Sequence, residues 1–118
     1  MIGDDGTQLG ILPPFEAPLN RHVYHLYVIR TARRAGMQAY LAERGISTLI
    51  HYPVPVHLQT AYLHLGYAAG SFPVTEQVAS EILSLPLYPH LGREEVDLVL
   101  KAVKECPFFD REPDSVIS

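Results

Sequence analysis

The spacing of apolar side chains predicts a helix over residues 93–105, near the C-terminal end of the chain. Its apolar residues recur at intervals of three and four, which places them on one helical face: Val96, Val99, Leu100 and Val103. Glutamates open the segment and lysines close it, which complements the partial charges at the two helix ends. Pro107 ends the helix because it lacks the backbone N–H that another turn would need.

A second helix is expected over residues 32–44, where Thr31 can cap the first turn. Its apolar face carries Met37, Tyr40 and Leu41. Gly45 follows and can adopt the left-handed conformation that ends many helices. Further along, Gly66 would end a short helix over residues 60–65 in the same way.

Pro73 predicts the start of another helix because its fixed φ suits the first helical turn. Glu76 follows closely and complements the positive end of that helix. Three apolar residues lie at intervals of four and indicate one buried face: Val74, Val78 and Ile82.

Three segments are expected to be extended. Residues 22–29 are apolar on both faces and rich in β-branched and aromatic side chains, which is typical of a strand covered on both sides. Residues 46–50 form a short strand, and the helix before it favours a parallel crossover or neighbouring places in one sheet. Residues 84–89 contain two prolines, which an edge strand tolerates. The predicted fold class is α+β, a small sheet of three to four strands with helices packed mainly on one face.

Composition narrows the functional classes. The chain has 118 residues, of which 47% are hydrophobic, so a packed core is expected. The net charge of −4 and the lack of a dense basic patch argue against nucleic-acid binding. The single cysteine, Cys106, excludes an intramolecular disulfide and is expected to be inert. We expect neither a signal peptide nor a membrane span of ~20 apolar residues, and therefore a cytoplasmic protein without membrane contact.

Most reactive side chains favour ordinary structural roles. His22 and His25 are three apart on an expected strand and point to opposite faces, so they cannot hold one metal ion. No metal-binding motif accompanies the six histidines. The two lysines, Lys101 and Lys104, fall on the polar side of the last helix, where neither is placed to form a Schiff base. We therefore assign no catalytic, cofactor-binding or metal-binding residue to this chain.

The densest cluster of functional side chains lies in residues 51–59, with the sequence HYPVPVHLQ. Two prolines stiffen this loop, and His51, Tyr52 and His57 offer hydrogen-bond donors and acceptors to a polar ligand. The same side chains could instead pack on the domain as a rigid connector. Residue chemistry alone leaves both interpretations open.

Five segments occur in an order and spacing that is specific as a set. They are HVYHLYV at 22–28, LAERGI at 41–46, HYPVPVHLQ at 51–59, FPVTE at 72–76 and EILSLPLYP at 81–89. Together they resemble the C-terminal domain of the DegT/DnrJ/StrS sugar aminotransferases. The resemblance covers residues 12–105.

The resemblance implies a fold like the small C-terminal domain of aspartate-aminotransferase fold-type enzymes. Members of this family are homodimers that use pyridoxal phosphate to move an amino group, commonly from glutamate, onto a keto group of a nucleotide-linked sugar. Their products enter surface polysaccharides and antibiotic sugars. On this basis the chain divides into an irregular lead-in at 1–11, the small domain at 12–106 and a flexible tail at 107–118.

The sequence departs from the family in length and in cofactor motifs. Members are much longer, and their large domain holds the Schiff-base lysine, the aspartate facing the pyridine nitrogen and the phosphate-binding groups. Because none of these motifs occurs here, this chain alone is expected neither to bind the cofactor productively nor to transaminate. The family motif carries over only His51, Tyr52 and His57, as residues that orient the nucleotide-sugar substrate, weakly in the isolated chain.

Two hypotheses follow from the resemblance. The chain is either the C-terminal domain of a sugar-nucleotide aminotransferase or a standalone, non-catalytic binding module derived from that family. An unrelated small α/β protein is a third, remote alternative. In the first two cases the face that packs on the large domain is expected to be apolar and to join copies of the chain into a homo-oligomer.

Overall fold

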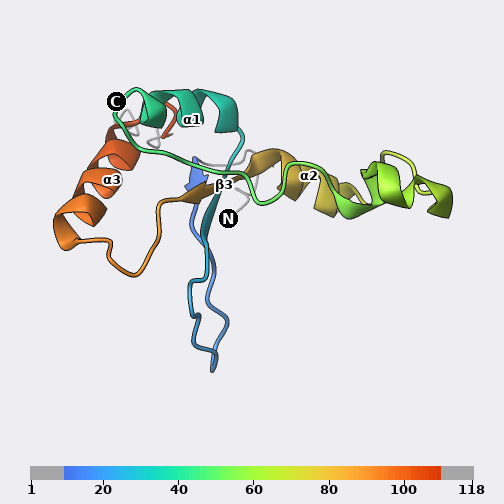
Figure 1. Ribbon diagram of the computed structural model, residues 1–118, viewed down its shortest axis with the longest axis horizontal. Coiled ribbons are helices and arrows are strands. Elements are labelled where there is room, and N and C mark those ends of the chain that lie inside the picture. Colours follow the sequence, from blue (N-terminus) through green and yellow to red (C-terminus); the bar gives the residue numbers. More distant parts are fainter. Residues whose placement is uncertain (1–9, 110–118) are drawn as a thin grey trace, which may run out of the picture.

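The computed structural model describes residues 10–109 (Figure 1). In chain order its elements are β1 (Ile11–Leu12), β2 (Tyr27–Thr31), α1 (Arg34–Ala42), the 3₁₀ helices η1 (Val56–Leu58) and η2 (Thr60–Leu65), α2 (Pro73–Glu81), β3 (Ile82–Leu85) and α3 (Arg93–Glu105). Most of the expected lead-in at 1–11 and of the expected tail at 107–118 lies outside the described residues.

The three strands form one antiparallel sheet in the order β1-β2-β3. Ile29 of β2 stands opposite Leu83 of β3, and both side chains are buried. Side chains alternate between the two faces of a strand, so this pair marks the covered face of the sheet. On the outer edge of β3, Leu49 adds a single antiparallel bridge to Ser84.

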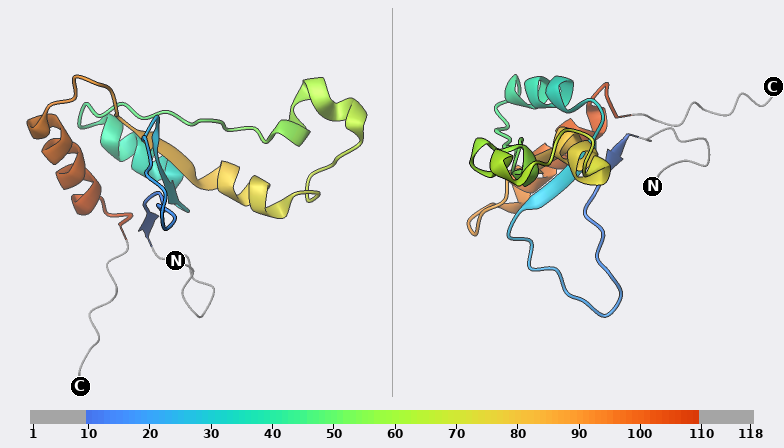
Figure 2. Two further views of the ribbon diagram at one scale, coloured as in Figure 1. Left: turned by 90° about the horizontal axis from the view of Figure 1, so that it is seen from below. Right: turned by 90° about the vertical axis from the view of Figure 1, so that its right-hand side faces the viewer.

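Helices α1 and α3 cover the face of the sheet that carries Ile29 and Leu83. They contribute four buried side chains to the core: Met37, Leu41, Ala102 and Val103. Figure 2 shows both helices at one end of the molecule, while α2 runs away from the sheet toward the other end. The predicted α+β class, with three strands and helices mainly on one face, is confirmed.

The helix predictions hold with small changes in their bounds. Helix α3 spans the predicted residues, and its first turn is capped by Glu95, whose Oε2 accepts the backbone N–H of Gly92 at 2.7 Å. Helix α1 ends at Ala42, and the turn after it closes as expected at Gly45, which has a φ of 73°. The backbone N–H of Ile46 reaches the carbonyl of Leu41 at 3.0 Å, which closes the helix. Thr31 does not cap α1: it ends β2, and its hydroxyl accepts the N–H of Arg33.

The strand expected over residues 22–29 begins only at Tyr27 and continues to Thr31. Tyr24 has a φ of 48°, outside the extended range, and its N–H donates to Nδ1 of His22. His22 and His25 are therefore not sheet residues. They lie in a projecting loop, residues 13–26, which stands away from the body in Figure 1. Aromatic and β-branched composition could not distinguish this exposed loop from a strand.

Two further expectations change in detail. The strand expected over 46–50 reduces to the bridge at Leu49. The chain at Leu49 has the same direction as β2, because both pair antiparallel with β3. The face expected to be buried on α2 is open: Val74 is 75% exposed, and Ile82 belongs to β3. The edge strand expected over 84–89 lies earlier, at Ile82–Leu85, and ends before Pro86, so the prolines are not part of it.

Candidate functional site

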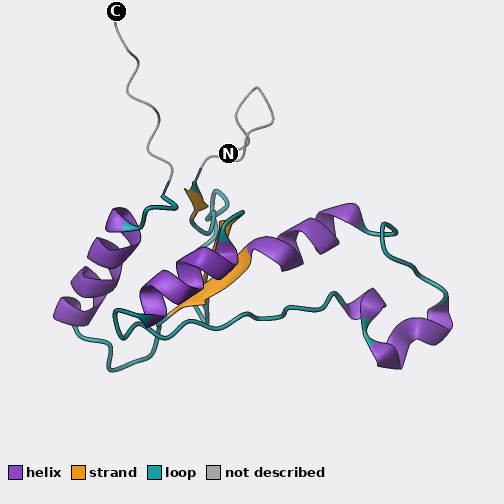
Figure 3. Ribbon diagram, turned by 90° about the horizontal axis from the view of Figure 1, so that it is seen from above, coloured by secondary structure: helices purple, strands orange, loops and turns teal. Residues whose placement is uncertain are grey.

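The loop rich in histidine and tyrosine leads from the sheet edge into a side arm, residues 52–72. This arm carries η1 and η2, and the chain returns from it through α2 into β3. Figure 3 shows the arm as an excursion that reaches well beyond the sheet. All side chains of η2 are exposed, so the arm has little core of its own.

His51 lies where the loop leaves the sheet edge. Its Nδ1 is 2.8 Å from the hydroxyl oxygen of Ser84, a residue that is only 4% exposed. The half-buried imidazole lines a cavity of about 650 Å³ between residues 44–51, the segment after β3, and α3. His51 thus has one nitrogen engaged and its ring edge at an open cavity.

The cavity around His51 is mainly apolar with a few polar groups at its wall. Tyr88 donates its hydroxyl to Glu95 at 3.1 Å. Partial desolvation, followed by this contact with the carboxylate, raises the pKa of Tyr88. Arg44 also lines the cavity, but its guanidinium stacks 3.5 Å over the ring of Tyr40 and donates to the Tyr40 carbonyl.

His57 is buried at the base of the side arm and faces α2. Its Nε2 is 2.8 Å from Oε1 of Glu76, and its ring meets Phe72 edge-on with centroids 4.8 Å apart. The same carboxylate accepts the backbone N–H of Gly70 at 2.8 Å. This backbone hydrogen bond, and then the contact with His57, lower the pKa of Glu76. The imidazole therefore ties the arm to the first turn of α2.

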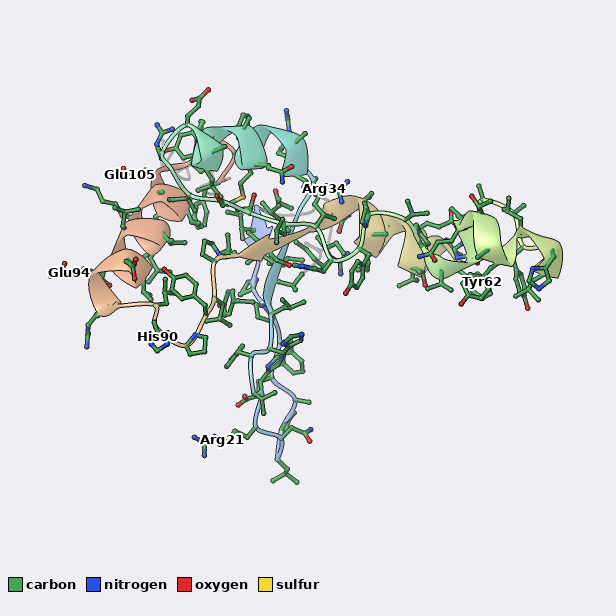
Figure 4. The ribbon with its side chains drawn as sticks, in the orientation of Figure 1. Arg21, Arg34, Tyr62, His90, Glu94 and Glu105 are labelled. Carbon is green, nitrogen blue, oxygen red and sulfur yellow. The ribbon has the colours of Figure 1, made fainter. Side chains whose placement is uncertain are left out.

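Tyr52 is largely exposed and stands edge-on to His51, with ring centroids 5.5 Å apart. It lines a second, shallower groove between the side arm and α2. The structure therefore brings His51 and Tyr52 side by side, whereas His57 is turned toward α2. Figure 4 places Tyr62 at the far end of the arm, well away from Glu94 at the start of α3.

Two side chains that contact the loop at 51–59 were not anticipated from the sequence. Ser84 was considered only as part of a proline-rich edge, although a serine within an apolar strand signals a buried polar contact. Glu76 was assigned only to the helix end, and its contact with His57 bridges 19 residues that no periodic pattern connects.

The residues that line the two cavities do not fit pyridoxal phosphate, the group implied by the resemblance. A Schiff base with that cofactor requires a lysine, and the chain's two lysines are exposed on α3 and line neither cavity. Between residues 10 and 109 no three potential metal ligands gather into a metal-binding group. Among the helices in that range, none is long and apolar enough to cross a bilayer.

The chain is similar in sequence to about a quarter of several longer proteins. The chain is 48% identical over 95 residues to the erythromycin biosynthesis sensory transduction protein EryC1 of Saccharopolyspora erythraea, covering 80% of the chain and 26% of that protein. It is 47% identical over 96 residues to dTDP-3-amino-3,4,6-trideoxy-alpha-D-glucose transaminase of Streptomyces venezuelae, covering 81% of the chain and 25% of the relative.

A solved structure shares the fold. The crystal structure of S. venezuelae DesV in complex with a ketimine intermediate matches 81% of this chain and 26% of that chain, with a TM-score of 0.79 and 47% identity. The chain thus spans about a quarter of the length of the relatives it matches. The model of the DegT/DnrJ/EryC1/StrS aminotransferase family matches residues 7–104, and the chain therefore belongs to this family.

Proposed function

We propose that this chain is the C-terminal part of a sugar-nucleotide aminotransferase, which transfers an amino group from a donor such as glutamate to a keto sugar nucleotide. The observation that carries the proposal is the match to one quarter of a nucleotide-sugar transaminase at 47% identity. The chain would supply one wall of the substrate pocket, and the remaining three quarters would supply the cofactor and the reacting lysine.

Within that pocket, His51, Tyr52 and His57 form the proposed substrate-binding loop. His51 and Tyr52 offer a ring nitrogen and a phenol to sugar hydroxyls or phosphate oxygens, since neither group is used up by the fold. His57 would shape the loop from the arm through its contact with Glu76. Pro53 and Pro55 stiffen the backbone between them.

A segment exchange tests this proposal directly. The segment of the S. venezuelae transaminase that aligns with this chain is replaced by the matching residues of this chain, and cofactor absorbance, thermal stability and amino transfer are measured. We expect a folded, cofactor-loaded and active chimera because the two segments share 47% identity. A chimera that folds and binds cofactor but transfers no amino group would contradict the proposal.

The isolated chain is proposed to be inactive. Pyridoxal phosphate added to it should give no Schiff-base absorbance near ~420 nm that survives dialysis, because no lysine lies at a cavity. A Lys101→Ala/Lys104→Ala double variant provides the control for adventitious reaction at the surface of α3. A strong band that survives dialysis, together with amino transfer by the unsubstituted chain, would overturn the expected inactivity, whereas a band that disappears in the double variant without amino transfer marks the surface lysines.

A second candidate is a non-catalytic binding module derived from the same family, and one observation favours it: the cavity at His51 is already formed in this chain. Calorimetric titration with thymidine diphosphate separates the candidates. Binding at micromolar concentration that is lost in His51→Ala would favour the module. Binding only in the millimolar range is expected for one wall of an incomplete pocket.

We also propose that copies of the isolated chain associate through the open groove between the side arm and α2. Its wall exposes apolar side chains, among them Val56 and Val74. Sedimentation at high micromolar concentration should show a dimer or larger species, and Val74→Lys should reduce it. A monomer throughout that range would contradict this proposal.

A further inference from the structure

Ser84 is a polar residue near the middle of β3, next to a core residue of the same strand. Its neighbour Leu83 points into the core, and successive side chains alternate, so Ser84 faces the opposite way. Only 4% of the residue is nevertheless exposed. The segment that includes Leu49 and His51 contacts it along this edge of the sheet.

The backbone of Ser84 fixes this segment in register. The N–H of Ser84 donates to the carbonyl of Leu49 at 2.7 Å, and the N–H of Leu49 donates back to Ser84 at 3.2 Å. Residues directly opposite in an antiparallel pair point to the same face, as do residues two apart along one strand. Leu49 and Ser84 therefore share one face, His51 reaches the same side through its contact with Ser84, and all three line the large cavity.

The side chain of Ser84 then engages one edge of the imidazole. Its hydroxyl oxygen lies 2.8 Å from Nδ1 of His51, whereas Nε2 has no hydrogen-bond partner within residues 10–109. A hydroxyl can act as donor or acceptor, so the direction of this hydrogen bond decides which of the two neutral forms the ring takes.

We propose that Ser84 is a positioning residue: it donates its hydroxyl proton to Nδ1 of His51, so that the ring presents Nε2–H to the cavity. An Nε2–H donor suits the oxygen acceptors of a nucleotide sugar, namely hydroxyls, diphosphate and carboxylate. The choice of a nucleotide sugar as ligand rests on the proposed function, whereas the position of the proton on His51 is a property of the chain itself. Buried Ser84 would thus orient a substrate-contacting group without touching substrate.

Nitrogen-15 histidine NMR of the full chain tests the proton position. At a pH where free imidazole is neutral, the His51 signals should show a single form, with Nδ1 unprotonated and Nε2 protonated. His51→Gln assigns the signals. Ser84→Ala should replace the single form by an average of both forms, Ser84→Thr should restore it, and Ser47→Ala, at an exposed serine of the same cavity wall, should leave it unchanged.

Two results would overturn the proposal. One is a wild-type spectrum with the proton on Nδ1 or averaged between the nitrogens, which decides the matter even if Ser84→Ala does not fold. The other is a folded Ser84→Ala chain whose His51 signals match those of wild type.

A functional readout uses the same substitution in the chimera described above. Ser84→Ala should raise KM for the nucleotide sugar about tenfold, the effect of one hydrogen bond, and leave cofactor absorbance unchanged. An unchanged KM in an active chimera would contradict the positioning role toward substrate. An inactive unsubstituted chimera would instead count against the proposed function, while the NMR result stands independently.

Discussion

The two histidines of one short motif lie in contrasting regions of the molecule. His51 sits at the edge of the body, where a buried serine holds one nitrogen and a cavity opens beside the ring. His57 lies in the side arm, 8% exposed, with its Nε2 on Glu76. The body is stabilised by a shared apolar core, whereas the arm depends on one carboxylate and a few aromatic contacts. The same side chain therefore lines a cavity in one region and ties the arm to α2 in the other, because its neighbours differ.

The largest expected difference between the two regions concerns leucine truncation. Leu41→Ala removes a side chain that is 0% exposed in the core and should lower the free energy of unfolding by about 2–5 kcal/mol. Leu63→Ala makes the same change in the arm, at a residue that is 55% exposed. It should change the free energy of unfolding by less than about 0.5 kcal/mol. Urea unfolding of both variants measures this, and equal losses would show that the arm shares the core's stability.

An intermediate effect is expected at the contact between His57 and Glu76. His57→Ala removes the 2.8 Å hydrogen bond and the ring packed on Phe72, so the arm should open locally. Hydrogen exchange at Gly70 and Phe72 should become faster by on the order of tenfold, while exchange in α1 stays unchanged. His64→Ala, at an exposed histidine of η2, is the matched control. Equally faster hydrogen exchange in the arm and in α1 would show that the arm does not open independently of the body.

The smallest expected effect is a pH dependence confined to the arm. The folded arm lowers the pKa of Glu76 below its ordinary value of 4.5, chiefly through the N–H of Gly70. The stabilisation is therefore fully present above that ordinary value and is lost as the pH falls through the lower, folded-state pKa. Amide shifts of Gly70 and Phe72 should follow this titration, and Glu76→Gln should abolish it. An identical acid transition in the Gln variant would assign the effect to another group.

Local features of the fold were predictable from the sequence. The bounds of α3 follow from its apolar spacing and from the charges at its ends. Gly45 and Gly66 end their helices with positive φ, as a residue without Cβ allows. These features depend on neighbours within a few positions, which a sequence displays directly.

Features that depend on distant partners were not predictable in the same way. Residues 22–25 have the composition of a strand, yet within residues 10–109 no strand pairs with them, and Tyr24 leaves the extended range. The sequence indicated the loop at 51–59 as the candidate site. It could not show that His51 contacts Ser84 whereas His57 contacts Glu76, so that the two imidazoles lie in different surroundings. Both contacts join segments far apart in the chain, so only the fold brings them together.

The bridge between Leu49 and Ser84 also bears on the order of events during folding. The side-chain contact beside it spans 33 residues, and the whole side arm with α2 lies inside that closed loop. Loop closure costs more entropy as the enclosed segment lengthens, so this contact should form after the local turns and helices. The cavity wall would then be assembled late, and lengthening the arm would slow its assembly while leaving the helices that frame the core largely unaffected.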